Sequence, residues 1–294
     1  MKPDIFAVIG GDFRSVVVIN QLITSGYTVK VYGFDDDPAI SRSAIRAESL
    51  ADALADSSYV VLPLPCSLQN ESIINTPLFS GKIPVSDLLA GLPGKPVVLG
   101  GMLDNVFRAT LEAKDIVYAD YFKREELTVR NAIPTAEGAL EIALRETPHT
   151  LHGSNCLIAG YGRIAKVLSK ALAGLGAKVT VSARKHSDLA WIDANGYNAI
   201  ETKKIKDHIH SFDVIFNTVP HKIFDRDTLH FAKRDCLILD LASKPGGIDF
   251  DAAQKFGLNV IWALSLPGKN APLTAGSIIT DTIMNIIGEL EAEE

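Results

Sequence analysis

A short glycine-rich turn near the middle of the chain leaves the sequence around it few folds to adopt. The run Ala159-Gly160-Tyr161-Gly162-Arg163-Ile164-Ala165 has the spacing G-x-G-x-x-A, between an apolar stretch and a helix-like stretch. In such units the first glycine permits a tight turn, the second lets a pyrophosphate approach the backbone, and the small third residue lets the helix pack closely. The N–H groups around Arg163 and Ile164 would hold the phosphates. We expect a dinucleotide site here; the alternative is a Rossmann-like domain that has lost its ligand.

Strand-like and helix-like stretches alternate on both sides of this turn. Apolar runs typical of buried strands lie at residues 5–9, 28–32, 59–62, 96–99 and 116–118, and again at 156–159, 178–182, 213–217, 237–241 and 259–262. Helical periodicity marks residues 14–22, 104–113 and 163–175. A long helix is expected from Pro134 to Glu146, because proline suits a first helical turn. The alternation predicts an α/β fold of two doubly wound parallel-sheet, Rossmann-like domains with a cleft between them.

The length of the chain also favours two domains. It has 294 residues, of which 47% are hydrophobic, whereas single cores rarely grow beyond about 250 residues. We expect an N-terminal substrate and dimerisation domain at 1–148, an interdomain hinge in the stretch 147–154, and an NAD(P)-binding domain at 149–272. In residues 273–294, apolar side chains recur on one helical face, which predicts a last helix that packs back on the N-terminal domain.

Charge and cysteine content exclude several classes of function. The formal net charge is -6 and the isoelectric point is near 5.7, so no field attracts nucleic acid or an anionic membrane surface. No apolar run approaches the roughly 20 residues of a membrane span. Cys66, Cys156 and Cys236 are too widely spaced for a zinc site or a disulfide framework. No metal is expected, and we expect a cytoplasmic protein because the start of the chain has no secretion-type segment.

Cofactor choice is decided where the second strand of the dinucleotide unit ends. NAD enzymes place an acidic residue there, about 20 residues past the first glycine, on the ribose hydroxyls. Here the chain reads Ser182-Ala183-Arg184-Lys185, without a carboxylate. The Ser182 hydroxyl and the Arg184 guanidinium can bind a 2′-phosphate, so NADP is expected. NAD is the alternative if these cations are ordinary surface charges. Thr218-Val219-Pro220 follows the fourth strand, where the nicotinamide ribose lies in this fold.

Polar residues that can contact a substrate lie in loops after strands. His221 and Lys222 follow the fourth strand and can reach the reaction centre, although such a histidine is more often a partly exposed loop residue. Lys244 and Lys269 lie in glycine-proline loops and can bind carboxylates. Sharp turns with solvated lysines explain the same pattern equally well.

Two further anion-binding candidates lie at expected helix starts in the first half of the chain. Arg14, in Gly10-Gly11-Asp12-Phe13-Arg14, has a planar fork that can grip a carboxylate, and the helix N-terminus adds a favourable potential. Thr135 and the N–H groups beside it can also bind an anion. Many of the neighbouring charges are expected to be solvated surface.

Five motifs together resemble one protein family. They are Gly10-Gly11-Asp12-x-Arg14, Tyr121-Phe122-x-Arg124-Glu125-Glu126, the run Asn131 to Gly138, Gly160-Tyr161-Gly162-Arg163 and Leu266-Pro267-Gly268-Lys269. On these residues the whole chain looks like the A subunit of bacterial dipicolinate synthase. More loosely, it is similar to the adenosylhomocysteinase and 2-hydroxyacid dehydrogenase group, although the acidic ribose-binding residue is missing and no His-Asp/Glu dyad is apparent.

The resemblance implies a reaction, a partner and a setting. It implies oxidation of a dihydrodipicolinate-type compound, made by the lysine-pathway synthase, to pyridine-2,6-dicarboxylate with NAD(P) as acceptor. It also implies a B subunit of dipicolinate synthase similar to flavin-binding decarboxylases, assembly into a homo-oligomer and hetero-oligomer, and a place in the mother-cell cytoplasm during sporulation. The rival interpretations are another NADP-dependent reductase of a small carboxylate or imine, and a non-catalytic nucleotide-binding scaffold for the B subunit.

On this basis the roles of the polar residues can be stated as a hypothesis. The substrate carboxylates are expected to be held by some of Arg14, Arg124, Thr135, Lys244 and Lys269. The ring proton is expected to leave to His221, Lys222, Glu125 or water while a hydride passes to the nicotinamide. Substitution of Gly160 by Asp is expected to abolish NADP binding while the chain stays folded.

Overall fold

The computed structural model describes residues 4–68 and 72–293. Within it the chain forms two compact units. The first unit comprises the residues up to Asn131 together with those from Ala271 on, and the second unit is Ala132–Asn270. Residues 1–3, 69–71 and 294, which fall within the expected domain limits, lie outside the described residues.

The first unit is built on a six-stranded parallel sheet with the order β3-β2-β1-β4-β5-β6. Its strands are β1 (Ile5–Ile9), β2 (Thr28–Tyr32), β3 (Ile45–Arg46), β4 (Tyr59–Val61), β5 (Val97–Gly100) and β6 (Tyr118–Asp120). Its helices are α1 (Phe13–Thr24), α2 (Leu50–Leu54), α3 (Val85–Gly91), α4 (Asn105–Ala113), the 3₁₀ turn η1 (Tyr121–Lys123) and α12 (Pro272–Glu293). Helix α5 (Glu125–Glu146) starts in this unit and continues into the second.

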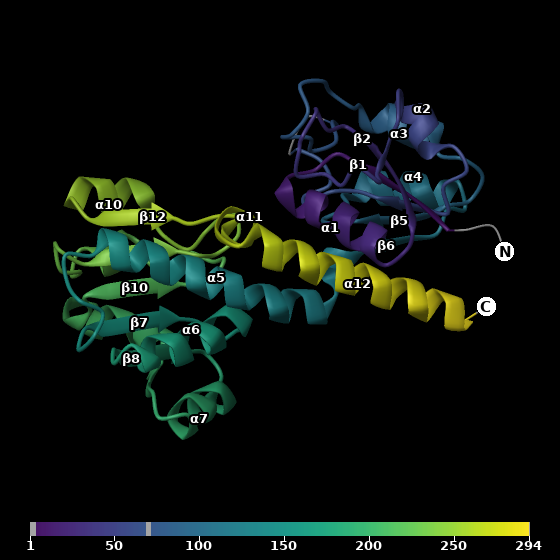
Figure 1. Ribbon diagram of the computed structural model, residues 1–294. Coiled ribbons are helices and arrows are strands. Elements are labelled where there is room, and N and C mark those ends of the chain that lie inside the picture. The colour runs from purple at the N-terminus through teal and green to yellow at the C-terminus, as the bar shows by residue number, and fades with distance from the viewer. Residues whose placement is uncertain (1–3, 69–71, 294) are drawn as a thin grey trace. The chain divides into compact units, whose positions relative to one another are not determined.

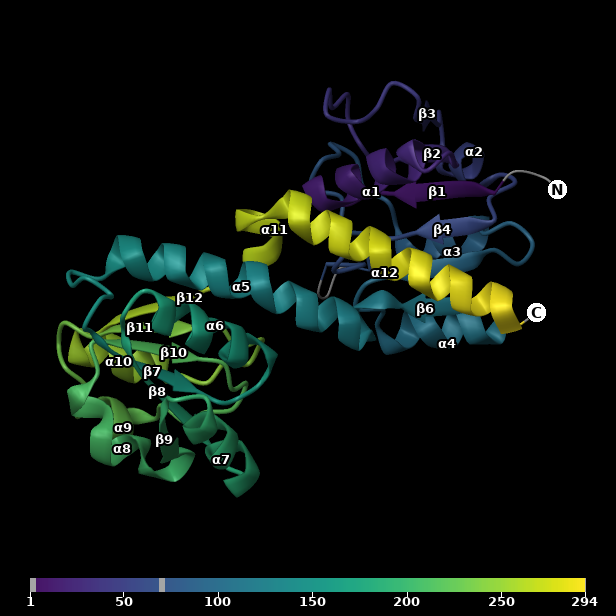
Figure 2. The ribbon, with the colours of Figure 1, turned by 60° about the horizontal axis from the view of Figure 1, so that its bottom comes forward.

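Alternate residues of the central strand β1 enter two different cores, which shows that both faces of the first sheet are covered. Phe6 and Val8 pack in a core with α1 and α12, whereas Ala7 and Ile9 pack in a core with α2, α3 and α4. Helices α1 and α12 lie side by side in Figure 1 and Figure 2. They meet at Gly276, where a Cβ atom would lie 2.5 Å from the Cβ of Val17, so only glycine allows this approach.

The second unit repeats this plan with the order β12-β11-β10-β7-β8-β9, again parallel throughout. Its strands are β7 (Asn155–Ala159), β8 (Lys178–Ala183), β9 (Asn198–Glu201), β10 (Val214–Asn217), β11 (Leu237–Asp240) and β12 (Asn259–Trp262). Its helices are α6 (Arg163–Gly174), α7 (His186–Ala194), α8 (Ile205–His208), α9 (Arg226–Leu229), α10 (Phe250–Phe256) and α11 (Leu266–Asn270), with 3₁₀ turns η2 (Thr202–Lys204) and η3 (Ile209–Ser211).

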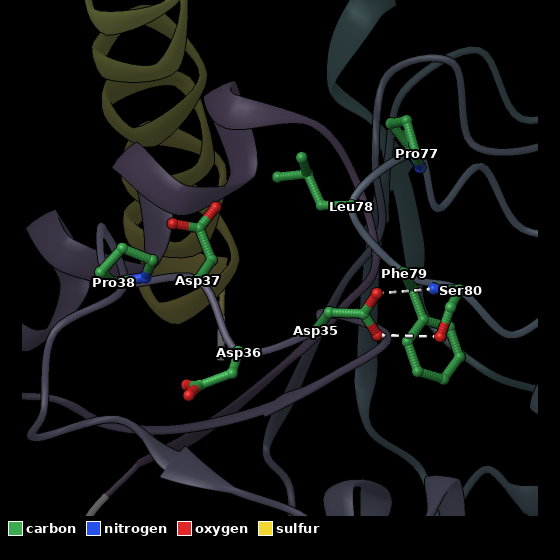
Figure 3. A pocket seen from close by; sticks show the side chains of 8 residues that line it. All are labelled: Asp35, Asp36, Asp37, Pro38, Pro77, Leu78, Phe79 and Ser80. Carbon is green, nitrogen blue, oxygen red and sulfur yellow. Dashed lines mark hydrogen bonds between the residues drawn. The ribbon is translucent and has the colours of Figure 1, made fainter.

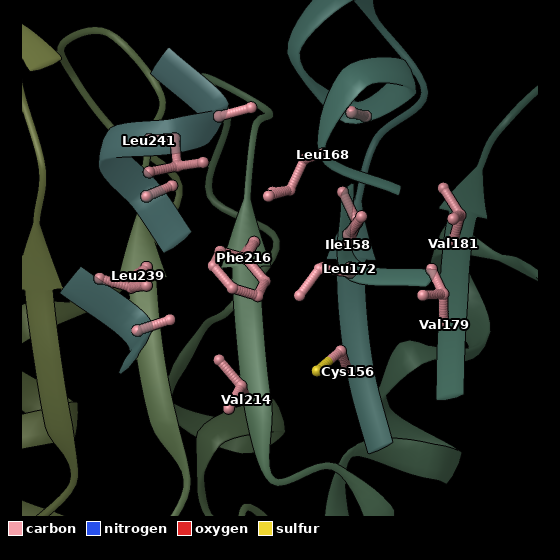
Figure 4. Close-up of a cluster of buried hydrophobic side chains, with 14 of the residues drawn as sticks. Cys156, Ile158, Leu168, Leu172, Val179, Val181, Val214, Phe216, Leu239 and Leu241 are labelled. Atoms are coloured by element: carbon pink, nitrogen blue, oxygen red, sulfur yellow. The ribbon is translucent and has the colours of Figure 1, made fainter. Parts of the chain in front are cut away.

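The strands of the second sheet are apolar on both sides because each side meets a helical layer. Figure 4 shows one of these cores, in which Cys156, Ile158 and Phe216 point from the strands toward Leu168 and Leu172 of α6. The same core receives residues of α5 and Leu266 of α11. The opposite face carries a second core with residues from α8, α9 and α10. The expectation of two doubly wound parallel-sheet units is therefore confirmed.

Helix α5 differs from its expected start. It begins at Glu125, nine residues before Pro134, so the proline lies inside the helix rather than in its first turn. An interior proline normally costs about 3 kcal/mol. Here both ends of the helix are held by packing, since Leu127 is buried in the first unit while Ala139 and Ala143 are buried in the second. Glu125 and Glu126 in the first turn also favour this start, because acidic side chains stabilise a helix N-terminus.

The two units divide inside α5, between Asn131 and Ala132, and not in the stretch 147–154 where a hinge was expected to separate them. The reason is the same packing: the C-terminal part of α5 contributes Ala136, Ala139 and Ala143 to the core of the second unit. No helix among the described residues is long and apolar enough to cross a membrane.

Candidate functional site

The order of strands in the second sheet reverses beside β7. The chain passes from β7 to β8 and β9 on one side, and then to β10, β11 and β12 on the other. In open α/β sheets, ligands bind at such a switch point, beyond the carboxyl ends of the strands. The loop after β7, which carries Gly160 and Gly162, and the loop after β10, which starts with Thr218, both leave the sheet at this edge.

Gly160 is required by the fold itself. Its φ is +95°, a left-handed conformation that glycine adopts freely. Its N–H donates to the carbonyl of Ser182 at 3.0 Å. A Cβ atom at this position would lie 2.7 Å from Oγ1 of Thr218 and 2.8 Å from Cγ2 of Val219. A side chain at position 160 would collide with the β10 loop, so Gly160→Asp would strain the fold as well as affect cofactor binding and cannot separate the two effects.

Gly162 is open where Gly160 is crowded. It is the N-cap residue of α6, with φ −87° and ψ −165°, and no side chain caps the helix there. A Cβ atom on Gly162 would have no neighbour within 4 Å. Ala165, in contrast, is completely buried against the sheet, and Ile164 packs partly against the same core. The turn thus joins a close helix-sheet contact to bare backbone at a 12-residue helix start, the arrangement that receives a diphosphate.

The end of β8 presents cations rather than the serine expected from the sequence. The Ser182 hydroxyl is completely buried and has no hydrogen-bond partner among the described residues, so it does not face solvent where a ribose phosphate would arrive. Its carbonyl instead holds the Gly160 N–H. Ala183, the last residue of the strand, is buried as well. Arg184 and Lys185 follow, exposed and without an ion pair among the described residues.

The ends of β10 and β11 are tied together by two buried polar side chains. Asn217 and Asp240 are both completely buried. The Asn217 side-chain Nδ2 donates to Oδ1 of Asp240 at 2.8 Å and to the carbonyl of Val219 at 3.0 Å, and its Oδ1 accepts from the Val219 N–H at 3.1 Å. Thr218 Oγ1 donates to the carbonyl of Ala159 at 2.8 Å, which links this loop to the glycine turn.

The two catalytic candidates after β10 have different surroundings. His221 and Lys222 are both exposed, as is Pro220 before them. Lys222 Nζ lies 3.6 Å from Oδ2 of Asp249, so this ammonium has a carboxylate partner. Lys244 is also exposed and precedes a cis proline in the loop after β11.

Gly138 allows a close contact between two motifs that are far apart in the sequence, residues 131–138 and residues 266–269. Gly138 lies in α5, and a Cβ atom there would come within 3.1 Å of Leu266 Cβ and of Asn270 Oδ1, both in α11. Helix α11 is therefore seated directly on α5. This places the exposed Lys269 of α11 on the second unit, which also carries the half-buried Thr135 of α5.

In the first unit, Arg14 lies in the first turn of α1, but its guanidinium is largely used within the unit. Nε and Nη2 donate to the carboxylate of Asp12, and Nη2 also donates to the carbonyl of Leu64. The side chain is 11% exposed. Nearby, Tyr121 is fully buried and donates to the carbonyl of Leu62 at 2.9 Å, and burial raises the pKa of its hydroxyl.

Arg124 has another role than the expected one. Its Nη1 and Nη2 donate to Glu289 of α12 at 2.6 Å and 2.5 Å, and its Nε donates to Glu126 at 2.8 Å. Hydrogen bonds to Glu289 and then to Glu126 raise the pKa of Arg124. The guanidinium thus ties the start of α5 to α12, so all three of its nitrogens already have carboxylate partners. Glu125 beside it is exposed in the first helical turn.

A hollow that the sequence did not indicate lies after the end of β2 in the first unit. It has a volume of about 410 Å³ and is lined by residues 35–38 and 77–80. In Figure 3, the Asp35 carboxylate reaches across to Ser80, accepting from its N–H at 3.0 Å and from its hydroxyl at 3.1 Å. Asp36 and Asp37 make the lining acidic, which is unsuited to an anionic ligand.

The three cysteines lie inside the two units. Cys66, Cys156 and Cys236 are buried and unbonded. Burial raises the pKa of the Cys66 thiol and raises those of Cys156 and Cys236 to about 12, which keeps them unreactive. No group of three or more metal-ligating side chains occurs within residues 4–68 and 72–293.

Comparisons with known proteins match both units. Residues 5–122 match the N-terminal domain of the dipicolinate synthase A subunit, and residues 129–244 match the NAD binding domain of D-isomer specific 2-hydroxyacid dehydrogenase. The dipicolinate synthase A subunit of Bacillus subtilis (strain 168) is 32% identical over 291 residues, which cover 98% of this chain and 97% of that protein.

Two solved structures have the same fold over nearly their whole length. The A chain of dipicolinate synthase from Bacillus subtilis superposes with a TM-score of 0.90 and 30% identity, covering 100% of this chain and 99% of that one. The corresponding protein from Bacillus halodurans superposes with a TM-score of 0.89 and 28% identity, covering 96% and 97%. The second unit is thus a nicotinamide-dinucleotide-binding domain of the dehydrogenase type.

Proposed function

The chain belongs to the family of the dipicolinate synthase A subunit, and on that premise we propose that it oxidises a dihydrodipicolinate-type cyclic dicarboxylate to pyridine-2,6-dicarboxylate with NADP⁺ as hydride acceptor. The observation that carries the proposal is the bare backbone at Gly162, at the start of α6 and at the switch point of a dehydrogenase-type sheet. The fold itself does not require glycine at position 162, where a side chain would meet nothing. A diphosphate that rests against the backbone does require one.

The residues of the second unit fit NADP better than NAD. Gly160 shapes the turn, and the start of α6 with Arg163 and Ile164 receives the diphosphate. The end of β8 offers Ala183 where an NAD enzyme has a carboxylate, followed by two exposed cations, Arg184 and Lys185. A 2′-phosphate is the group that this combination would attract. The bound dinucleotide supplies the hydride acceptor.

For the substrate we propose a smaller set of residues than the sequence suggested. Lys244, Lys269 and Thr135 of the second unit are exposed or half-buried and can meet a carboxylate. Arg14 of the first unit is engaged by the Asp12 carboxylate and the Leu64 carbonyl, so we do not assign it to this set. Removing a hydride and a proton from a dihydropyridine dicarboxylate yields an aromatic ring. We propose that His221 or a water molecule accepts the proton, since Lys222 faces Asp249 and the Glu125 carboxylate accepts from Thr128 Oγ1.

The name of the relatives, which designates one subunit of a synthase, implies a second, B subunit. We propose that this chain acts with such a partner, as a homo-oligomer, in the mother-cell cytoplasm of a sporulating bacterium. The partner's contribution to turnover is open to direct measurement, because the proposed dinucleotide-binding turn lies within this chain.

The decisive assay mixes the purified chain with NADP⁺ and freshly generated dihydrodipicolinate, and follows the absorbance of reduced cofactor with and without the B subunit. Reduction of NADP⁺ that occurs with dihydrodipicolinate and does not occur when this compound is omitted supports the proposal. Turnover of 2-keto acids with NADPH in place of this reaction would instead identify a different reductase. Dinucleotide binding without any turnover, even with the B subunit, would identify a nucleotide-binding scaffold.

Cofactor choice is tested separately with Arg184→Asp. The introduced carboxylate would repel the 2′-phosphate and accept the ribose hydroxyls, so the affinity for NADP⁺ should fall at least about tenfold while that for NAD⁺ rises. Lys203→Asp, at an exposed cation in η2 paired with Glu201, is the charge-matched control and should leave the preference as it is. Equal NADP⁺ affinity in Arg184→Asp and the parent chain would refute this assignment.

A further inference from the structure

A buried carboxylate lies at the carboxyl ends of the strands of the second sheet, in a position that the sequence did not single out. Asp240 is the last residue of β11 and is completely buried. Its Oδ1 accepts from Asn217 Nδ2 at 2.8 Å and from the Ala242 N–H at 3.1 Å, and its Oδ2 accepts from the Gly247 N–H at 2.8 Å. A carboxylate is costly to bury unless it is well hydrogen-bonded. Here one partner, Asn217, ends the strand β10, and the other two lie in the loop after β11.

Asn217 in turn holds the loop after β10. The Asn217 side chain bonds both the N–H and the carbonyl of Val219, so it fixes the first turn of the chain after β10. Val219 in turn lies where a Cβ atom on Gly160 would collide. A continuous set of contacts therefore runs from Asp240 through Asn217 and Val219 to the glycine turn.

The other loop, residues 241–248, is held directly. Gly247 is so close to Asn217 that a Cβ atom on it would lie 2.3 Å from Nδ2. The carbonyl of Gly247 accepts from the N–H groups of Ile223 at 3.1 Å and Phe224 at 3.0 Å. This closes the segment that carries His221 and Lys222 against the loop that carries Lys244.

The location of this network within the sheet indicates what it positions. A doubly wound sheet has two mononucleotide-binding halves, and the half that follows the glycine turn holds the adenosine, because its second strand ends at the ribose-binding residue. In this unit that half is β7 to β9, so the nicotinamide end falls to β10, β11 and β12. Asn217 and Asp240 end the first two of these strands.

We propose that Asp240 is a positioning residue for the nicotinamide half of the cofactor, acting through Asn217 and through the Gly247 N–H. The carboxylate sets the β10 loop and the β11 loop in one fixed arrangement, so that the nicotinamide ring and the reacting carbon of the substrate meet in register. The inference rests on the proposed use of a dinucleotide, and it deepens that proposal by naming the group that orders its reacting end.

The test separates the two ends of the cofactor. Asn217→Ala and Asp240→Asn are compared with the parent chain for binding of NADP⁺ and of adenosine 2′,5′-bisphosphate, which reports the adenosine end alone, by calorimetry. Asp240→Asn keeps one acceptor oxygen but turns an NH₂ toward a donor, and Asn217→Ala leaves Asp240 its two backbone donors. Both variants should raise the Kd for NADP⁺ on the order of tenfold and lower kcat, with the bisphosphate Kd changed less than about twofold.

Asp213→Asn is the matched control, because Asp213 precedes β10 at the opposite edge of the same sheet and accepts from the Asn155 N–H and from Lys233. It should lower the melting temperature without changing either Kd. If both site variants bind NADP⁺ as the parent does, or weaken both ligands equally, the positioning role is refuted; should Asp240→Asn fail to fold, Asn217→Ala decides alone. A parent chain that binds neither probe would refute the proposed dinucleotide function itself.

Discussion

Substitution of Gly162 by Asp should separate cofactor binding from folding, with effects of opposite sign. Gly162 is the N-cap of α6, its φ of −87° is open to any residue, and no side chain caps the helix. A Cβ atom there meets nothing within 4 Å. Aspartate is among the preferred N-cap residues and its charge favours a helix N-terminus. The free energy of unfolding should therefore stay constant or rise by about 0.5 kcal/mol.

Binding should respond in the opposite direction. The new carboxylate would occupy the space in which the diphosphate rests against the backbone. Two unit charges about 4 Å apart repel by about 4 kcal/mol at an effective dielectric constant of about 20. Because about 1.4 kcal/mol corresponds to a tenfold change in Kd, the affinity for NADP⁺ should fall by about three orders of magnitude.

The assay pairs thermal unfolding with calorimetric titration of NADP⁺. Gly174→Ala, at the last residue of the same helix and also without neighbours within 4 Å, is the control and should bind normally. Gly160→Ala is the opposite case: with φ +95° and contacts of 2.7 and 2.8 Å, it should lose about 1–3 kcal/mol of stability through backbone strain. If Gly162→Asp folds and binds NADP⁺ within a few-fold of the parent chain, the diphosphate does not rest at this turn.

Three further predictions concern the framework. Gly276→Ala should destabilise the first unit by about 1–3 kcal/mol in denaturant unfolding, because its Cβ would lie 2.5 Å from Val17. Gly288→Ala on the same helix has no neighbour within 4 Å and should stabilise the unit by up to about 1 kcal/mol. Equal effects of the two substitutions would contradict the close packing of α12 on α1. Arg124→Gln should lower the melting temperature without changing the KM for substrate. The control Arg130→Gln, which breaks an ion pair with Asp281 at 2.7 Å, should do the same. A raised KM in Arg124→Gln alone would show that Arg124 binds substrate. Burial opposes ionisation of Asp213, but hydrogen bonds from Lys233 and the Asn155 N–H hold its pKa below the usual value. The carboxylate therefore stabilises the fold above about pH 4, and that stability is lost as the pH falls through the folded pKa. The difference in unfolding free energy between the parent and Asp213→Asn should shrink on acidification, and a constant difference would exclude this linkage.

Features that depend on neighbouring residues could be predicted from the sequence of this protein. The strands are short and apolar on both sides, so β1, β7 and β10 could be placed without knowing their neighbours. The glycine turn could be identified in the same way, because its three requirements fall on residues close together in the sequence. Gly160 allows the tight turn, Gly162 leaves the start of the helix bare, and Ala165 is small enough to pack against the sheet. The family resemblance rested on motifs of this kind, and the comparisons confirm it.

Tertiary structure decided whatever depends on which distant residue a group meets. Nothing near Arg124 in the sequence announces Glu289 as its partner, and nothing near Ser182 shows that its hydroxyl is sealed in the sheet while Arg184 is free to act. Helix α5 runs through Pro134 because packing at its two ends outweighs a local penalty. The bond from Asn217 to Asp240 exists only because the order of the strands sets β10 beside β11. Periodicity and turn chemistry act over a few residues, whereas the pairing of charges and buried polar groups is settled only when the sheet is assembled.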